Sequence, residues 1–319
     1  MPDEPDEGYR IVVDESSFDF RSIEDATLSN LLDELSDALE VLQASHTVAA
    51  SPGWGEVECR EGLLLAQFLY DRAQSSVSPS VLVRLARHID KCRGWEDVDD
   101  PTGPVEIDTR SVDIAWSVHY ALHRTFVGKS VACLGLSTSE RRGWLRVCCH
   151  EAAAETEVYF FAAADELPQF WRGLYEREDI PEHRFLELAD LAFPELVLAP
   201  GLKFRKFDGS YAEMREWVVR ALCAINDEFP SAMSRNSGQP QAVQAALGHL
   251  GLDLSPESPR TRANARVMKL RDIEHEGVTY RCEWHAKKEP HHNRIHFSLP
   301  ATTLGGKILI GIFIDHLPT

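Results

Sequence analysis

The sequence predicts an α+β protein with an acidic, helix-rich N-terminal domain and a C-terminal αβ domain that contains an antiparallel sheet. Apolar residues recur every three or four positions along most of the N-terminal part, which is typical of amphipathic helices. Short β-rich runs separated by turn residues gather after about residue 265. We expect a disordered tail at 1–8, an acidic helix-rich domain at 9–194 and a C-terminal αβ domain with a basic antiparallel sheet at 196–319.

Several elements of the N-terminal domain can be placed from the pattern. A short strand is expected at 9–13, and leucines spaced by three and four predict a helix at 25–44. Ser78 followed by Pro79 has the residue types of a helix N-cap and first turn. Three apolar, β-rich runs predict a small antiparallel meander, at 130–136, 144–149 and 157–163.

The C-terminal domain begins with a strand, a turn and a second strand at 196–207. Ser210 then caps a long helix that ends near Phe229, and a short helix is expected at 241–250. A loop at 255–262 leads to four predicted strands, at 265–271, 278–287, 293–299 and 307–315.

The net charge of −18 is unevenly distributed. Residues 259–319 hold ten Lys/Arg against six Asp/Glu, whereas the other 258 residues hold 23 against 45. The C-terminal piece is therefore suited to a polyanion such as RNA, and the rest would repel one. No apolar run reaches the ~18 residues of a membrane span, so we expect no membrane partner. Seven cysteines without a CxxC pair indicate reduced thiols and a cytoplasmic location.

Alternation along two of the predicted strands gives them one apolar and one basic face. If the strands at 278–287 and 293–299 pair, a single sheet face carries the basic residues Arg281, His285, Lys287, Arg294 and His296. Lysine and arginine bind phosphate, and histidine can move a proton near neutral pH. This combination suits cleavage of an RNA backbone.

The motif WHAKKEPHHNRIHF followed by KILIGIFIDHL resembles the YoeB branch of the RelE-type toxins. The order of elements from about 196 to 319 also looks like that small fold. The resemblance implies a ribosome-associated mRNA endonuclease that needs no metal or other cofactor. It implies that Arg294 steadies the scissile phosphate, that His316 is the acid and that Glu274 is the base. Lys287 and Lys288, which follow the motif's tryptophan, would then bind substrate along with the basic sheet face.

Two alternatives remain open from the sequence. The histidines at 285, 291, 292 and 296 are close enough in sequence to converge on a metal, although no acid or cysteine nearby completes a standard site. One hypothesis is that the acidic domain inhibits the basic face within the chain, and another is that it binds a protein partner. Otherwise the whole chain is a non-enzymatic interaction or sensor protein of a bacterial stress or defence system.

Overall fold

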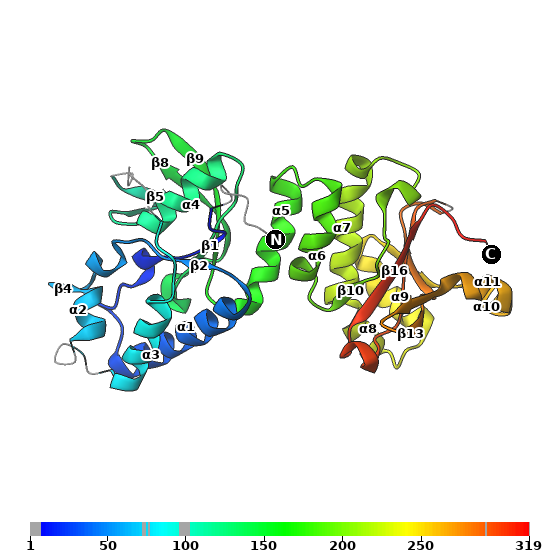
Figure 1. The fold of residues 1–319 in the computed structure, drawn as a ribbon, viewed down its shortest axis with the longest axis horizontal. Coiled ribbons are helices and arrows are strands. Elements are labelled where there is room, and N and C mark those ends of the chain that lie inside the picture. The colour runs from blue at the N-terminus through cyan, green and yellow to red at the C-terminus, as the bar shows by residue number, and fades with distance from the viewer. Residues whose placement is uncertain (1–7, 72–74, 76, 96–102, 291, 319) are drawn as a thin grey trace. The chain divides into compact units, whose positions relative to one another are not determined.

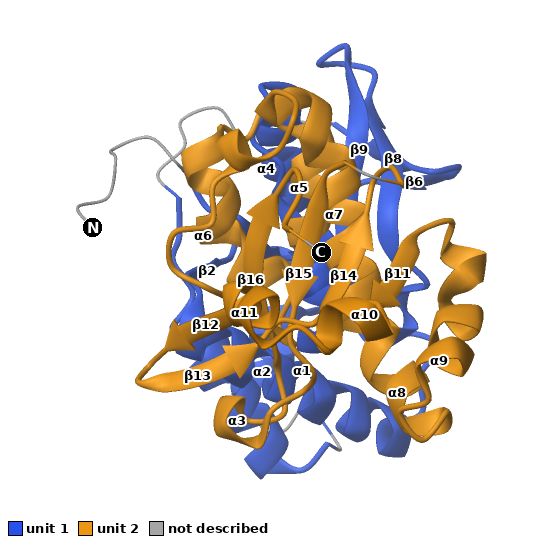
Figure 2. Ribbon diagram, turned by 90° about the vertical axis from the view of Figure 1, so that its right-hand side faces the viewer, with its two compact units in different colours: residues 1–170 blue, residues 171–319 orange. Residues whose placement is uncertain are grey.

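The structure, a computed structural model, describes all residues except 1–7, 72–74, 76, 96–102, 291 and 319 (Figure 1). It divides into two compact units, Met1–Phe170 (unit 1) and Trp171–Thr319 (unit 2), which are coloured separately in Figure 2. The division lies inside helix α5, Leu167–Arg177, and not after residue 194 where we expected it. Apart from Gly8, the predicted tail lies outside the described residues.

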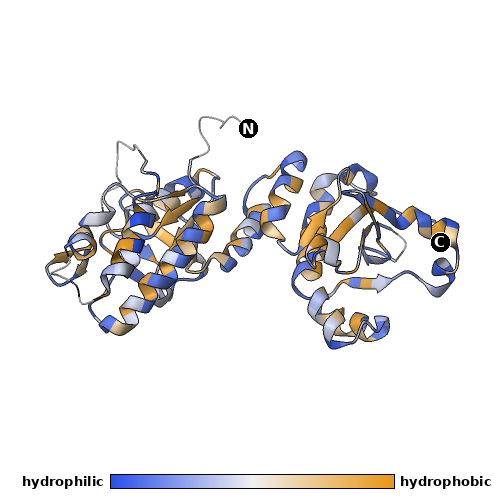
Figure 3. Ribbon diagram, turned by 60° about the horizontal axis from the view of Figure 1, so that its bottom comes forward, coloured by the Kyte–Doolittle hydropathy of each residue, from blue (hydrophilic) through white to orange (hydrophobic). Residues whose placement is uncertain are grey.

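The α+β class is confirmed, with helices packed on mostly antiparallel sheets. In Figure 3 the strands of both units are predominantly hydrophobic, as buried strands should be. None of the helices within the described residues is long and apolar enough to cross a membrane.

Unit 1 contains a seven-stranded mixed sheet in the order β2-β1-β7-β9-β8-β5-β6. The strands, in that order, are Val48–Ala49, Ile11–Val13, Ala132–Leu134, Ala154–Phe161, Gly143–Cys149, Val105–Ile107 and Arg110–Val112. The predicted meander is only partly correct: β8 and β9 pair antiparallel, but β7 is parallel to β9. The reason is that β9 lies between β7 and β8, so the first run never pairs with the second.

Four helices accompany this sheet: α1 (Asp25–Ser45), α2 (Leu65–Tyr70), α3 (Pro79–Ile89) and α4 (Trp116–Phe126). The leucine spacing predicted α1 correctly, and all of its leucines are buried. Pro79 opens α3 as expected, in the first turn where its missing N–H costs no hydrogen bond. The hairpin of β3 (Glu58–Arg60) and β4 (Leu63–Leu64) precedes α2.

Unit 2 contains a five-stranded sheet in the order β10-β16-β15-β14-β11. The strands, in that order, are Leu196–Leu198, Ile308–Ile314, Arg294–Phe297, Trp284–Lys287 and Asp253–Pro256. β10 is parallel to β16, and the other pairs are antiparallel. Further helices of this unit are α6 (Glu182–Ala192), α7 (Tyr211–Asp227), α8 (Phe229–Arg235) and α9 (Pro240–Leu247).

The apolar face of this sheet packs against the helices that follow β10. Trp284 and Phe297 lie opposite each other on β14 and β15, and the ring of Phe229 in α8 contacts both at centroid distances of 5.0 Å. Ser210 caps α7 as predicted, because its hydroxyl accepts a hydrogen bond from the N–H of Glu213. The alternation along β14 and β15 therefore points its apolar residues to α8.

Several predictions in unit 2 were wrong. The run 278–287 is two strands, β13 (Val278–Arg281) and β14, and β13 pairs with β12 (Asp272–His275) as a separate hairpin. The expected strand at 265–271 is helical, forming α11 (Ala265–Met268) and the 3-10 turn η8 (Lys269–Arg271). Asn264 caps α11 by accepting a hydrogen bond from the N–H of Val267, which fixes a helix start. Similarly, the expected second strand before residue 207 is a 3-10 turn, Phe204–Lys206.

A short helix, α10 (Pro259–Arg262), precedes α11. Figure 2 shows α10 and α11 in front of β14, β15 and β16, and Figure 1 places them beyond β16 from α7. We call the stretch Ser258–Arg271, which contains α10, α11 and η8, the basic segment. It covers the polar face of the sheet, opposite the face that packs on α8.

Candidate functional site

The register of β14 and β15 places four of the predicted site residues on one face of the sheet. Lys287 lies opposite Arg294, and His285 lies opposite His296. We expected this face to be open to solvent, but the structure buries it: His296 is 0%, His285 3% and Arg294 6% exposed. The basic segment provides the cover, and one of its residues, the fully buried Arg271, reaches the histidines.

A buried carboxylate, Glu257, lies between the two imidazoles and Arg271. Its Oε1 accepts a hydrogen bond from Arg271 Nε at 2.6 Å, and it lies 3.7 Å from His285 Nδ1 and 3.8 Å from His296 Nδ1. We call Glu257, His285 and His296 the buried trio. Within the described part of the chain, neither of these two Nδ1 atoms has a hydrogen-bond partner. The trio is thus a gathering of three potential ligand or proton-transfer atoms around one point.

Burial determines the protonation of this cluster. It lowers the pKa of His285 to about 2 and that of His296 to about 3, and the neighbouring positive charges act in the same direction. The pKa of Arg294 is also lowered, again mainly by burial. Both imidazoles are therefore neutral near pH 7, with lone pairs available.

A second group lies at the edge of the same strands, and its two histidines are exposed while its arginine is buried. His292 and His316 lie just beyond the paired strands, two residues before Arg294 and two residues after its partner Ile314. His292 Nδ1 is 2.9 Å from Asp315 Oδ1, and this hydrogen bond raises the pKa of His292. We call His292, Arg294 and His316 the histidine rim. It combines two accessible imidazoles with a guanidinium whose Nε has no hydrogen-bond partner among the described residues.

The structure places Arg281 and Glu274 in a different sheet from this rim, whereas Lys287 lies beside it. Arg281 and Glu274 lie in the β12–β13 hairpin, where Arg281 pairs with Asp272 at 2.8 Å and Glu274 is opposite Thr279. Lys287 stays on the sheet face and pairs with Asp253 at 3.1 Å.

Lys288 points elsewhere, with its Nζ 3.4 Å from the carbonyl of Glu213. Of the histidines considered as metal ligands, His291 lies outside the described residues and His292 joins Asp208 and Asp315 rather than His285.

The strongest basic surface of unit 2 is the basic segment itself. It contains five cations and no acid: Arg260, Arg262, Arg266 and Lys269 are exposed, and Arg271 is buried. Sequence reasoning counted these charges but placed them in a loop and a strand. The Ser258-Pro259 start, which repeats the signal used for α3, was the clue to a helical segment.

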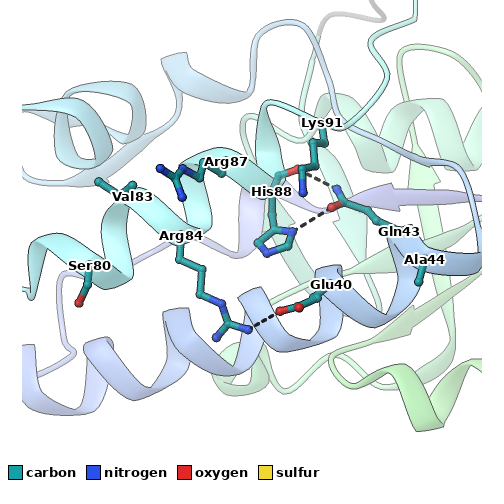
Figure 4. Close-up of a pocket in the computed structure, with 9 residues that line it drawn as sticks. All are labelled: Glu40, Gln43, Ala44, Ser80, Val83, Arg84, Arg87, His88 and Lys91. Carbon is teal, nitrogen blue, oxygen red and sulfur yellow. Dashed lines mark hydrogen bonds and ion pairs between the residues drawn. The ribbon is translucent and has the colours of Figure 1, made fainter.

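Unit 1 also contains hollows. A groove of about 610 Å³ lies between α1 and α3, and two pairs of its polar residues contact each other across it (Figure 4). Arg84 reaches Glu40 at 2.7 Å, and His88 Nδ1 is 2.9 Å from the side-chain oxygen of Gln43. These contacts connect the two helices.

A cleft of about 1120 Å³ lies at the carboxyl ends of β1 and β7, where open sheets commonly bind ligands. Arg141 at its edge is already paired with the buried Asp14 at 2.6 Å. Arg84 in the groove and Arg141 in the cleft are thus both neutralised by acids of the same chain.

No protein-family model matches this chain, and neither a curated protein nor a solved structure matches it. Its function therefore has to be inferred from its residues and their geometry.

Proposed function

We propose that unit 2 is a metal-independent endoribonuclease that binds RNA through the basic segment and cleaves it at the histidine rim. The observation that carries the proposal is that the exposed His292 and His316 both lie next to the pair Arg294–Ile314, at the end of strands covered by a run of cations. RNA carries its own nucleophile, so a base, an acid and a positive charge are sufficient for its cleavage.

The roles follow from the protonation of each group. The hydrogen bond with Asp315 raises the pKa of His292, so this ring holds its proton to a higher pH than an ordinary imidazole. His292 is therefore the better acid, and His316 is left to act as base, the reverse of the role suggested by the resemblance. His316 takes the proton of the 2′-hydroxyl, the 2′-oxygen attacks phosphorus, and the 5′-oxygen leaves with the proton of His292. The products are a 2′,3′-cyclic phosphate and a 5′-hydroxyl.

Arg294 stabilises the charge that develops on the phosphorane. Its lowered pKa reflects burial, so a phosphate that approaches it replaces missing solvation with an ion pair. Lys287, on the same face, adds positive charge, although Asp253 shares it. Glu274 has no part in this mechanism, because the β12–β13 hairpin holds it in a separate sheet.

The basic segment supplies affinity that does not depend on sequence. Four exposed cations without an intervening acid attract phosphates and release counterions on binding. Unit 1 has the opposite character: residues 1–170 hold 14 Lys/Arg against 31 Asp/Glu, which is −17, and residues 171–319 hold 19 against 20, which is −1. The proposal therefore includes inhibition of RNA binding by the acidic unit. It also includes a cytoplasmic location, which agrees with the seven free cysteines.

The test is cleavage of a single-stranded RNA by the purified full chain with a chelator present. We expect cyclic phosphate ends, a bell-shaped dependence of kcat/KM on pH, and a loss of about 100-fold or more in His292→Gln, Arg294→Ala and His316→Gln. His249→Gln, an exposed histidine of unit 2 far from the rim in sequence, is the matched control and should cleave normally. If the chain binds RNA without cleaving it, the protein is a non-enzymatic interaction protein. If all three variants still cleave RNA, the histidine rim is not the catalytic site.

A further inference from the structure

We propose that the buried trio, Glu257, His285 and His296, is a binding site for a divalent transition-metal ion such as Zn²⁺. Two imidazoles and one carboxylate are ligands that Zn²⁺ and related borderline cations prefer. Sequence spacing pointed to no acid for such a site, because Glu257 precedes His285 by 28 residues. The fold brings it there through the antiparallel pairing of β11 with β14.

The distances fit a tetrahedral ion after a small contraction. Bonds of about 2.0–2.2 Å to nitrogen and oxygen place the ligand atoms of a tetrahedral site about 3.4 Å apart. The two distances from Glu257 Oε1 to the Nδ1 atoms are 3.7 and 3.8 Å, and one ligand atom from each of the three residues lies within 4.8 Å of the others. Shifts of a few tenths of an ångström, within the freedom of side-chain torsions, would complete the geometry.

The state of the imidazoles supports a cation in this place. Both Nδ1 atoms are buried without a hydrogen-bond partner among the described residues, and such atoms carry a desolvation cost. Burial keeps both rings neutral, which is the form that coordinates metal. One ion would satisfy both nitrogens at once.

The neighbours of the trio are those that a ligand set commonly has. Ser255 Oγ lies 3.5 Å from His285 Nε2, where it can accept the N–H that a ring bound through Nδ1 must carry. Arg271 donates to the same Glu257 oxygen that faces the two rings. Its positive charge opposes that of the ion, so Arg271 should limit the affinity and provides a direct control.

Binding here would also fix the basic segment. Glu257 immediately precedes Ser258, the N-cap of α10, so an ion shared with β14 and β15 ties the start of the segment to the sheet. The metal site and the histidine rim use different residues. An experiment can therefore refute metal binding without refuting RNA cleavage, and can refute RNA cleavage without refuting metal binding.

The experiment uses the full chain carrying His292→Gln, which removes the exposed group Asp208–His292–Asp315 as a competing site. The protein is incubated, and separately refolded, with Co²⁺ or Zn²⁺ alone. We expect one equivalent of Co²⁺ with a tetrahedral spectrum lacking a thiolate charge-transfer band. Addition of His296→Gln should lower the Zn²⁺ affinity by about 100-fold or more, because loss of a neighbour of a ligand alone costs 10–100-fold. His249→Gln should leave it unchanged.

A second variant keeps the test decisive if His296→Gln does not fold, as judged by circular dichroism. Arg271→Met leaves all three ligands in place and removes the competing charge, so it should bind Zn²⁺ at least about tenfold more tightly. Either no bound Co²⁺ after refolding, a thiolate band, an affinity insensitive to His296→Gln, or weaker binding by Arg271→Met would overturn the site.

Discussion

The two buried imidazoles should make unit 2 sensitive to mild acid. In the folded state the pKa values of His285 and His296 are about 2 and about 3, whereas both groups start from 6.5. Below pH 6.5 the unfolded chain therefore binds protons that the folded chain does not. The free energy of unfolding falls as the pH falls, and the fall continues until the folded pKa values are reached.

The magnitude follows from these shifts. Each group contributes about 1.4 kcal/mol per pH unit once the unfolded imidazole is protonated, so two groups over two pH units, from 6.5 to 4.5, remove about 5 kcal/mol. That loss is comparable with the whole stability of many domains. In His296→Gln one titrating group is gone, and the loss over the same range should halve to about 2–3 kcal/mol.

The assay is urea unfolding of the full chain in the presence of a chelator. Hydrogen exchange in peptides that cover β14 and β15 is the readout, so that the measured unfolding is that of unit 2. The difference in unfolding free energy between pH 6.5 and 4.5 is compared in the parent chain and His296→Gln. Equal losses in the two proteins, or a loss below about 1 kcal/mol in the parent, would refute the assignment of both rings as neutral and buried.

Three further predictions concern packing and charge. Burial raises the pKa of Glu15 from 4.5 to about 7. The parent chain should therefore lose about 3 kcal/mol of unit 1 stability as the pH rises from 4.5 to 7, whereas Glu15→Gln should not. Urea unfolding at pH 5 and 8 would show this difference. Arg84→Ala breaks three half-exposed pairs with acids of α1 and should cost at most about 1 kcal/mol, an effect that vanishes in 1 M salt. A Cβ at Gly311 would collide with the sulfur of Cys282, so Gly311→Ala should lower the stability by about 1–3 kcal/mol in thermal unfolding. Gly248 has open space around it, so the control Gly248→Ala should leave the stability unchanged. Equal melting temperatures of the two variants would contradict this packing.

Local signals were sufficient for a large part of the fold. The leucine spacing of α1 and the cap of α7 at Ser210 are encoded within single helices, and the alternation in β14 and β15 gave the correct face for Trp284 and Phe297. The basic segment was missed because the apolar residues Val267, Met268 and Leu270 form a short run that resembles a strand. The cap at Asn264 decides for a helix instead.

The sequence was sufficient to predict which residues of the candidate site share a sheet face, but not that they are buried. Alternation placed Arg294 and His296 on one face, yet their burial depends on Arg271 folding back over the sheet to meet Glu257. Such a contact depends on where distant elements pack, which no local pattern states. Sequence reasoning treated His292 as a possible ligand, and its hydrogen bond with Asp315 became evident only with the end of β16 in place.

RNA binding by the basic segment is tested most directly by the salt dependence of affinity. Four exposed cations that contact phosphates of a single-stranded RNA predict a slope of log K against log salt near about −3, because each contact contributes about −0.7. Arg260→Ala with Arg266→Ala should reduce the slope by about 1.4. The control pair, Arg220→Ala with Arg235→Ala on α7 and α8, lies on the helix-covered face and should leave it unchanged. An equal change in both pairs, or no RNA binding by the parent chain, would contradict the proposed role of this surface.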